Sequence, residues 1–156
     1  MISAVKGHQV SANEVANYFV ELASEQDEND LTNLKLQKLL YIAQVVHLAK
    51  KKSPLFKEPI EAWDLGPVVR SVYENFKSCG SFPITAFDKH VEESNLPGDV
   101  KKFISMIWEE YGKYSASHLV DITHEPSSPW DKVFTKGENK EIPLELMADY
   151  FSRMSS

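Results

Sequence analysis

The sequence is poor in the residues that phosphate-binding and nucleophilic motifs need. It has 6 glycines and 1 cysteine among 156 residues. Neither G-x-x-x-x-G-K-[ST] nor G-x-G-x-x-G occurs, so the glycine-rich loops whose backbone amides cradle phosphates are missing. No serine lies in a G-x-S-x-G elbow. Nucleotide hydrolysis is therefore disfavoured, and we expect neither an enzyme nor a cofactor.

The single cysteine, Cys79, cannot form a disulfide within the chain. It lies at a predicted helix end, where the negative potential of the helix C-terminus raises a thiol pKa and deactivates the group. We interpret Cys79 as an incidental free thiol. Its isolation fits a reducing compartment.

Long apolar runs are also absent. No segment approaches the roughly 20 apolar residues that a helix needs to cross a bilayer. Met1 to Val10 lacks the basic start and apolar run of a secretion signal. The sequence thus predicts a cytoplasmic protein that is neither exported nor membrane-anchored.

Positive charge is scarce as well. The 17 Lys and Arg residues against 23 Asp and Glu give a formal net charge of -6, which argues against a duplex-binding protein. One predicted helix concentrates lysines, and stabilisation of its dipole explains part of this concentration. A local basic patch remains open at Lys35, Lys38, Lys50, Lys51 and Lys52.

The chain has enough apolar residues for one core, at 42% hydrophobic and 11% aromatic content, and no room for two ordinary domains. We therefore expect a single domain over residues 1–156. The hydrophobic periodicity predicts a mainly α, compact fold of about six helices around a central hydrophobic helix, with one or two short extended segments.

Helical patterns dominate the first third of the chain. Ser11 and Glu14 form a predicted capping box for a helix that runs to about Ala23. The acidic stretch 24–30 is predicted to be an exposed connection. Residues 33–51 form the predicted central helix, which Pro54 prevents from continuing.

Only a narrow polar stripe interrupts the apolar surface of this central helix. Its members recur at helical spacing. Polar residues on an otherwise buried helix either make internal hydrogen bonds or meet a partner, and both alternatives stay open. The stripe consists of Gln37, Tyr41, Gln44 and His47.

The remaining elements are shorter. Residues 55–63 favour a short edge strand or extended loop. Pro67 suits the first turn of a helix that presents Val68 and Val69 on its apolar face and ends near Gly80. After an irregular stretch at 81–95, helices are predicted at about 97–112 and 115–122, with a turn at Pro129 and a last helix after residue 142.

Histidines and carboxylates provide little evidence for a chemical centre. His118, Asp121 and His124 are spaced i, i+3 and i+6, which separates the outer pair by more than one helical turn and leaves a tetrahedral metal set incomplete. No metal site is expected. A hydrolase or transferase that uses Glu61 with His124 is a further hypothesis, because both residues lie in motifs dense in special residues.

Two motifs combine a tryptophan with a proline. In EAWDLGP, residues 61–67, and in SSPWDKVF, residues 127–134, the tryptophan either closes the core or anchors a partner. The core interpretation is favoured for both Trp63 and Trp130.

Three segments together resemble the Panacea domain, the SocA-like antitoxin family, which also includes phage-associated and GepA-like proteins. They are NLKLQKLLYIAQ at 33–44, PLFKEPIEAWDLGPVVRSVYENFK at 54–77, and HEPSSPWDKVF at 124–134. Their order is also similar, and the resemblance covers nearly the whole chain. The matching positions are Leu36, Lys38, Leu39, Tyr41, Glu61, Ala62, Trp63, Gly66, Pro67, Val68, Pro129 and Trp130.

The resemblance implies a helical domain that neutralises a separately encoded toxin by direct contact, with no catalytic residues. It leaves open an adaptor role in which the toxin is delivered to a protease. The acidic balance favours a basic toxin, encoded by an adjacent gene, as partner. The alternative is a phage- or mobile-element-derived regulatory module that binds nucleic acid. Our candidate partner-binding residues are Gln37, Tyr41, Gln44, Glu61, Trp63 and Trp130.

Overall fold

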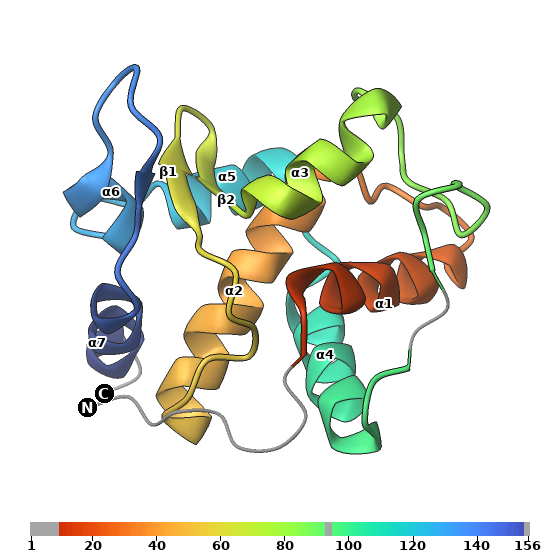
Figure 1. The fold of residues 1–156 in the computed structure, drawn as a ribbon, viewed down its shortest axis with the longest axis horizontal. Helices are drawn as coiled ribbons and strands as arrows, with labels where there is room; N and C mark the ends of the chain where they lie inside the picture. The colour runs from red at the N-terminus through yellow and green to blue at the C-terminus, as the bar shows by residue number, and fades with distance from the viewer. Residues whose placement is uncertain (1–9, 93–94, 155–156) are drawn as a thin grey trace.

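The computed structural model describes residues 10–92 and 95–154. Its helices and strands follow one another along the chain as shown in Figure 1. The order is α1 (Ala12–Ser24), α2 (Asn33–Lys51), β1 (Glu61–Trp63), β2 (Gly66–Val68), α3 (Arg70–Phe76), the 3₁₀ helix η1 (Lys77–Cys79), α4 (Gly98–Tyr111), α5 (Ala116–Thr123), α6 (Pro129–Val133), β3 (Lys140–Glu141) and α7 (Leu144–Met154).

Helix α2 is the centre of the fold, as predicted. In Figure 1 it runs through the middle of the molecule, with α7 on one side and α4 on the other. It contacts α1, α3, α4, α5, α7 and strand β2. A helix that is covered on almost every side must be apolar almost all round, which is the pattern that the sequence shows. The mainly helical architecture is therefore confirmed.

The predicted start of α1 is confirmed in detail. The Ser11 hydroxyl accepts a hydrogen bond from the Glu14 amide, and the Glu14 carboxylate accepts one from the Ser11 amide. This reciprocal pair satisfies two amides that the first helical turn leaves unpaired. Helix α2 is capped by Thr32 at its start and by Lys52 at its end, where Lys52 has a left-handed φ of 59°.

The sheet differs from the prediction. Strand β1 is not an edge strand, because it lies at the centre of a three-stranded antiparallel sheet with the order β2-β1-β3. Glu61 pairs with Val68 on one side and with Glu141 on the other. Strand β3 has two residues, too few for period-2 alternation to reveal it.

The predicted start of the third helix is also wrong. Pro67 lies in strand β2, and α3 begins only at Arg70. Side chains of α2 hold the intervening backbone extended: Gln37 Oε1 accepts a 2.9 Å hydrogen bond from the Val69 amide. Lys38 Nζ donates to the Pro67 carbonyl at 2.9 Å. These long-range bonds override a local preference for helix.

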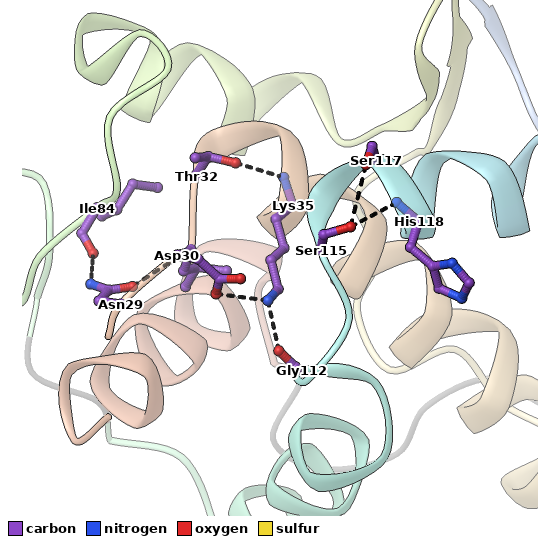
Figure 2. A network of polar contacts seen from close by, with 10 residues as sticks. Asn29, Asp30, Thr32, Lys35, Ile84, Gly112, Ser115, Ser117 and His118 are labelled. Atoms are coloured by element: carbon purple, nitrogen blue, oxygen red, sulfur yellow. Dashed lines mark hydrogen bonds and ion pairs between the residues drawn. The ribbon is translucent and has the colours of Figure 1, made fainter. Parts of the chain in front are cut away.

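Lys35 is fully buried and joins three segments of the chain (Figure 2). Its ammonium group donates to the Asp30 carboxylate at 2.8 Å and to the Gly112 carbonyl at 2.6 Å. The start of α2 is thereby fixed to the end of α4. The open alternative that Lys35 and Lys38 contribute to a basic surface patch is wrong, because both side chains are inside the fold.

Across the described parts of the chain, no helix combines the length and the apolar character that crossing a membrane requires.

Candidate protein-contact groove

A groove of about 740 Å³ opens between the β1–β2 hairpin, the start of α2 and helix α3. Five segments far apart in the sequence contribute to its walls. Its lining is more apolar than polar, which is typical of sites that bind another molecule. We call this the hairpin groove; its lining includes Asn33, Leu34, Gln37, Trp63, Asp64, Leu65, Val68, Tyr73, Ser81, Ala116 and Asn139.

The prediction that Trp63 lies in the core is wrong, because its side chain is half-buried and forms one wall of the groove, where it is held from several directions. Its indole nitrogen donates a 2.9 Å hydrogen bond to the Glu61 carboxylate. The same carboxylate accepts two hydrogen bonds from Arg70, at 2.7 and 3.2 Å. The Arg70 guanidinium lies 5.2 Å from the Trp63 ring centroid, and Tyr73 packs edge-on against that ring at 4.9 Å. The wall is therefore a preorganised aromatic surface with a polar edge.

Gln37 lies at the bottom of the groove but uses its amide internally. Its Nε2 donates to Asn33 Oδ1 at 2.9 Å, and Asn33 in turn donates to the Tyr73 carbonyl at 3.1 Å. Together with the Val69 bond, this chain of contacts positions α3 over α2. Gln37 thus supports the groove from below.

Lys38 lies beneath strand β2 and explains the glycine of the EAWDLGP motif. Gly66 has a φ of 112°, a backbone conformation that residues other than glycine rarely adopt. A Cβ at this position would lie 3.0 Å from Lys38 Cε. Burial lowers the pKa of the Lys38 amine to about 7. The glycine of the motif therefore allows the hairpin backbone to lie close to the buried Lys38 side chain.

Trp130 is buried, as the sequence favoured, and it supports Trp63 from behind. Its indole nitrogen donates a 2.6 Å hydrogen bond to the Trp63 carbonyl. Its ring stacks on Phe134 at 4.6 Å and packs against His124 at 4.0 Å. Glu61, Trp63 and Trp130 are thus brought together, although the two tryptophans are 67 positions apart in the sequence.

The other two candidates lie away from the hairpin groove. Gln44 is buried and accepts a 2.7 Å bond from the Leu55 amide while donating to the Phe56 carbonyl at 2.9 Å. Tyr41 lines a second, smaller cavity under α7, and its hydroxyl has no hydrogen-bond partner within the described residues. The internal-bonding alternative therefore holds for both glutamines of the polar stripe.

Among the described residues, three large apolar side chains are exposed, and sequence reasoning missed them. Leu65, at the tip of the hairpin, is 57% exposed and lines the groove. Phe82 is 76% exposed and directly follows Ser81 of the groove wall, while Phe87 is 97% exposed on the loop beyond. Leu65 and Phe82 beside a hollow are typical of a protein-binding surface, whereas Phe87 lies outside the groove lining. A position in a turn was the only available signal for Leu65.

The arrangement offers little for catalysis. The Glu61 carboxylate is occupied by Trp63 and Arg70, and no hydrogen bond joins it to His124 in the part of the chain that the structure describes. Burial and the Lys38 charge lower the pKa of His124. The Cys79 thiol donates to Asp88, and burial together with this carboxylate raises its pKa to about 11. Within residues 10–92 and 95–154, no group of three or more His, Cys, Asp or Glu could hold a metal ion.

The comparisons with known proteins agree with the sequence motifs. Residues 36–131 match the family model described as "Antitoxin SocA-like, Panacea domain". Antitoxin SocA of Caulobacter vibrioides is 33% identical over 148 residues, which cover 88% of this chain and 77% of that protein. No solved structure matches the chain. The family match spans α2, the hairpin, α3, α4, α5 and Trp130, and the chain therefore belongs to the SocA-like antitoxin family with the Panacea domain.

Proposed function

We propose that this protein is an antitoxin that neutralises a cognate protein toxin by direct binding, and that the hairpin groove is its contact face. The observation that carries the proposal is the exposed Leu65 beside the fixed Trp63 wall, in a chain that belongs to an antitoxin family. Tryptophan, tyrosine and arginine anchors in well-packed hollows supply most of the affinity in protein interfaces, and the groove wall contains Trp63 and Tyr73, with Arg70 against the Trp63 ring.

The rigidity of the groove supports this choice of face. Trp63 is oriented by Glu61, Arg70 and Tyr73, and the backbone behind it is held by Trp130. A wall that is fixed before binding loses little conformational entropy when a partner covers it. We infer that Glu61 and Trp130 act as positioning residues, whereas Trp63 contacts the toxin.

The charge of the chain indicates the chemistry of the partner. With a net charge of -6, the protein attracts a basic toxin and speeds the encounter. We expect the toxin gene to lie beside the antitoxin gene, and the pair to meet in the cytoplasm.

A growth-rescue assay with copurification tests the proposal. The adjacent open reading frame is expressed in a host cell with and without this chain, and an affinity tag on this chain recovers the complex. We expect growth inhibition that this chain relieves, together with recovery of the toxin. Absence of toxicity from either neighbouring gene would overturn the antitoxin role.

The contact face is tested with matched variants. Leu65→Asp places a charge in the groove, whereas Phe87→Asp places the same charge on an apolar residue that does not line it. We expect Leu65→Asp to abolish copurification and rescue, and Phe87→Asp to retain both. Rescue by Leu65→Asp at an equal protein level would move the contact face elsewhere.

Steric blocking and delivery to a protease are separated by following the toxin itself. We propose steric blocking, because a fixed groove can cover a functional surface without any further partner. Toxin half-life is measured with and without the antitoxin, in hosts that have or lack their cytoplasmic ATP-dependent proteases. A half-life that shortens only when antitoxin and proteases are both present would establish the adaptor role instead.

A further inference from the structure

Helices α2 and α4 run antiparallel, and this brings together lysines that are far apart in the sequence. At one end Lys35, near the start of α2, bonds to the Gly112 carbonyl just after α4. At the other end the last turns of α2 share a hollow with the first turns of α4, where the His47 ring packs edge-on against Phe103 at 5.2 Å. The C-terminus of α2 therefore lies beside the N-terminus of α4.

Five lysines gather at this second end. We call them the lysine face; they are Lys50, Lys51, Lys52, Lys101 and Lys102. Within residues 10–92 and 95–154, none of them forms an ion pair. Asp99 is the one acidic residue among the side chains that line the two hollows here. A protein with a net charge of -6 therefore carries a concentrated positive surface.

Helix stability does not explain this arrangement of charge. Lys50 and Lys51 favour the negative C-terminus of α2, but Lys101 and Lys102 lie within the first five residues of α4, near its positive end. Glu109 and Glu110 occupy its last turn, where they meet negative potential. Asp99 in the first turn agrees with the helix dipole, whereas both lysines and both glutamates oppose it. Most charges near the ends of α4 therefore do not stabilise the helix, which points to a role other than holding it.

The surface between the lysines is hollowed. One hollow of about 430 Å³ has Lys50, Lys51 and Lys102 on its rim and an apolar floor that includes Val100, Phe103 and Met106. A second hollow continues along α4, where Lys101 lies over the Tyr18 ring at 5.7 Å. A charged rim thus borders an apolar and aromatic floor over two adjoining hollows.

We propose that the lysine face binds single-stranded nucleic acid, with phosphates at the lysines and bases over the hollows. A single strand carries one phosphate for every base. Its phosphates can therefore contact the lysines while its bases pack on the apolar and aromatic residues between them. In a duplex the bases are stacked inside the helix, so they are not available to pack in the apolar hollows. This activity goes beyond toxin neutralisation and uses a different surface from the hairpin groove.

The hollows between the lysines favour a nucleic-acid strand over an acidic peptide. Lysine binds phosphate and carboxylate alike as a compact point charge, so the charge alone does not separate these two ligand classes. The apolar and aromatic floor makes the distinction, because bases stack on aromatic side chains whereas a run of acidic residues leaves the floor uncovered. An acidic protein segment is therefore the competing ligand class that the experiment must exclude.

The test measures fluorescence anisotropy of labelled 20-nucleotide single strands, oligo(U) RNA and oligo(dT) DNA, titrated with the full chain. We expect binding at 50 mM salt that weakens on the order of 100-fold at 200 mM, because up to about five phosphate contacts give a salt slope near -3.5. Either RNA or DNA preference supports the proposal and identifies the source of the strand. Absence of binding to both strands at 50 mM salt would overturn it.

Matched variants locate the binding. Lys51→Glu with Lys102→Glu should weaken it more than tenfold and flatten the salt slope. Lys132→Glu with Lys136→Glu changes net charge equally at exposed positions outside the hollows and should alter binding less than threefold. Equal losses in the two double variants would overturn the proposal. So would tighter binding of an unlabelled 15-residue oligo-glutamate peptide that competes the strands off.

The variants also separate this inference from the proposed function. The Lys51→Glu, Lys102→Glu protein should still rescue growth, and Leu65→Asp should still bind the single strands. Circular dichroism and the melting temperature confirm that each variant is folded. If Leu65→Asp, folded to the same extent, lost nucleic-acid binding as well, the two surfaces would not be independent and the inference would fail.

Discussion

The indole nitrogen of Trp130 donates a 2.6 Å hydrogen bond to the backbone carbonyl of Trp63. This bond joins the two tryptophan motifs of the family and fixes the hairpin against α6. We predict that Trp130→Phe, which keeps the stacking on Phe134, destabilises the protein by about 1–3 kcal/mol because the Trp63 carbonyl loses its partner. Urea denaturation measures the change.

Trp108→Phe is the matched control for this variant. It removes the same atoms from a half-buried indole whose nitrogen makes no hydrogen bond within the described residues. The loss of stability caused by Trp108→Phe should be smaller than the loss caused by Trp130→Phe. If both variants cost the same, packing rather than the hydrogen bond accounts for the effect of Trp130.

Stability should depend on pH through Lys38. Burial lowers its pKa from 10.5 to about 7, so between these values the unfolded chain binds more protons than the folded one. The free energy of unfolding should therefore rise from about pH 7 to about pH 10.5, by on the order of a few kcal/mol. Urea denaturation at four pH values across this window measures the slope.

Lys38→Met isolates this contribution, since it keeps most of the buried volume and cannot titrate. The difference in slope between the parent and the variant belongs to Lys38, whereas other titrating groups cancel. We expect the stability of the variant to depend less on pH, apart from a constant loss because the Pro67 carbonyl loses its hydrogen-bond partner. Equal slopes in the two proteins would contradict the assignment.

Gly66→Ala should destabilise the hairpin by about 1–3 kcal/mol, because it combines a φ of 112° with a Cβ 3.0 Å from Lys38 Cε. Gly80→Ala also has a positive φ, 58°, but its Cβ would meet nothing within 4 Å. The difference between the two losses measures the contact with Lys38. Thermal unfolding of both variants gives this comparison, and a larger loss for Gly80→Ala would contradict it.

The sequence predicted elements whose cause is local. The capping box at Ser11 and Glu14, the apolar length of α2 and the last helix after residue 142 all depend on neighbours a few positions away, and the structure contains each of them. The start of α3 could not be predicted this way. There Gln37 and Lys38 hold an extended backbone about thirty residues further on.

The candidate site was predictable in part for the same reason. Trp63 and Trp130 were identifiable as unusual residues, but the bond between them joins distant segments. A basic patch that includes Lys35 and Lys38 remained open, because sequence alone does not show that the loop before α2 and the hairpin cover them. The exposed Leu65 depends on the direction of a turn, which composition does not determine.

The charge pattern of α4 leads to the last prediction. Lys101→Glu combined with Glu110→Lys should stabilise the protein by about 0.3–1 kcal/mol for each reversed charge at low ionic strength, because both changes then agree with the helix dipole. The gain should shrink as salt screens the charges. Thermal unfolding at 20 mM and 500 mM salt measures both effects. Reversal at the same time removes a lysine from the lysine face, so single-strand binding should weaken while stability rises. A double variant that is less stable would show that these charges hold α4 in place, and the case for a binding role would lose its main support.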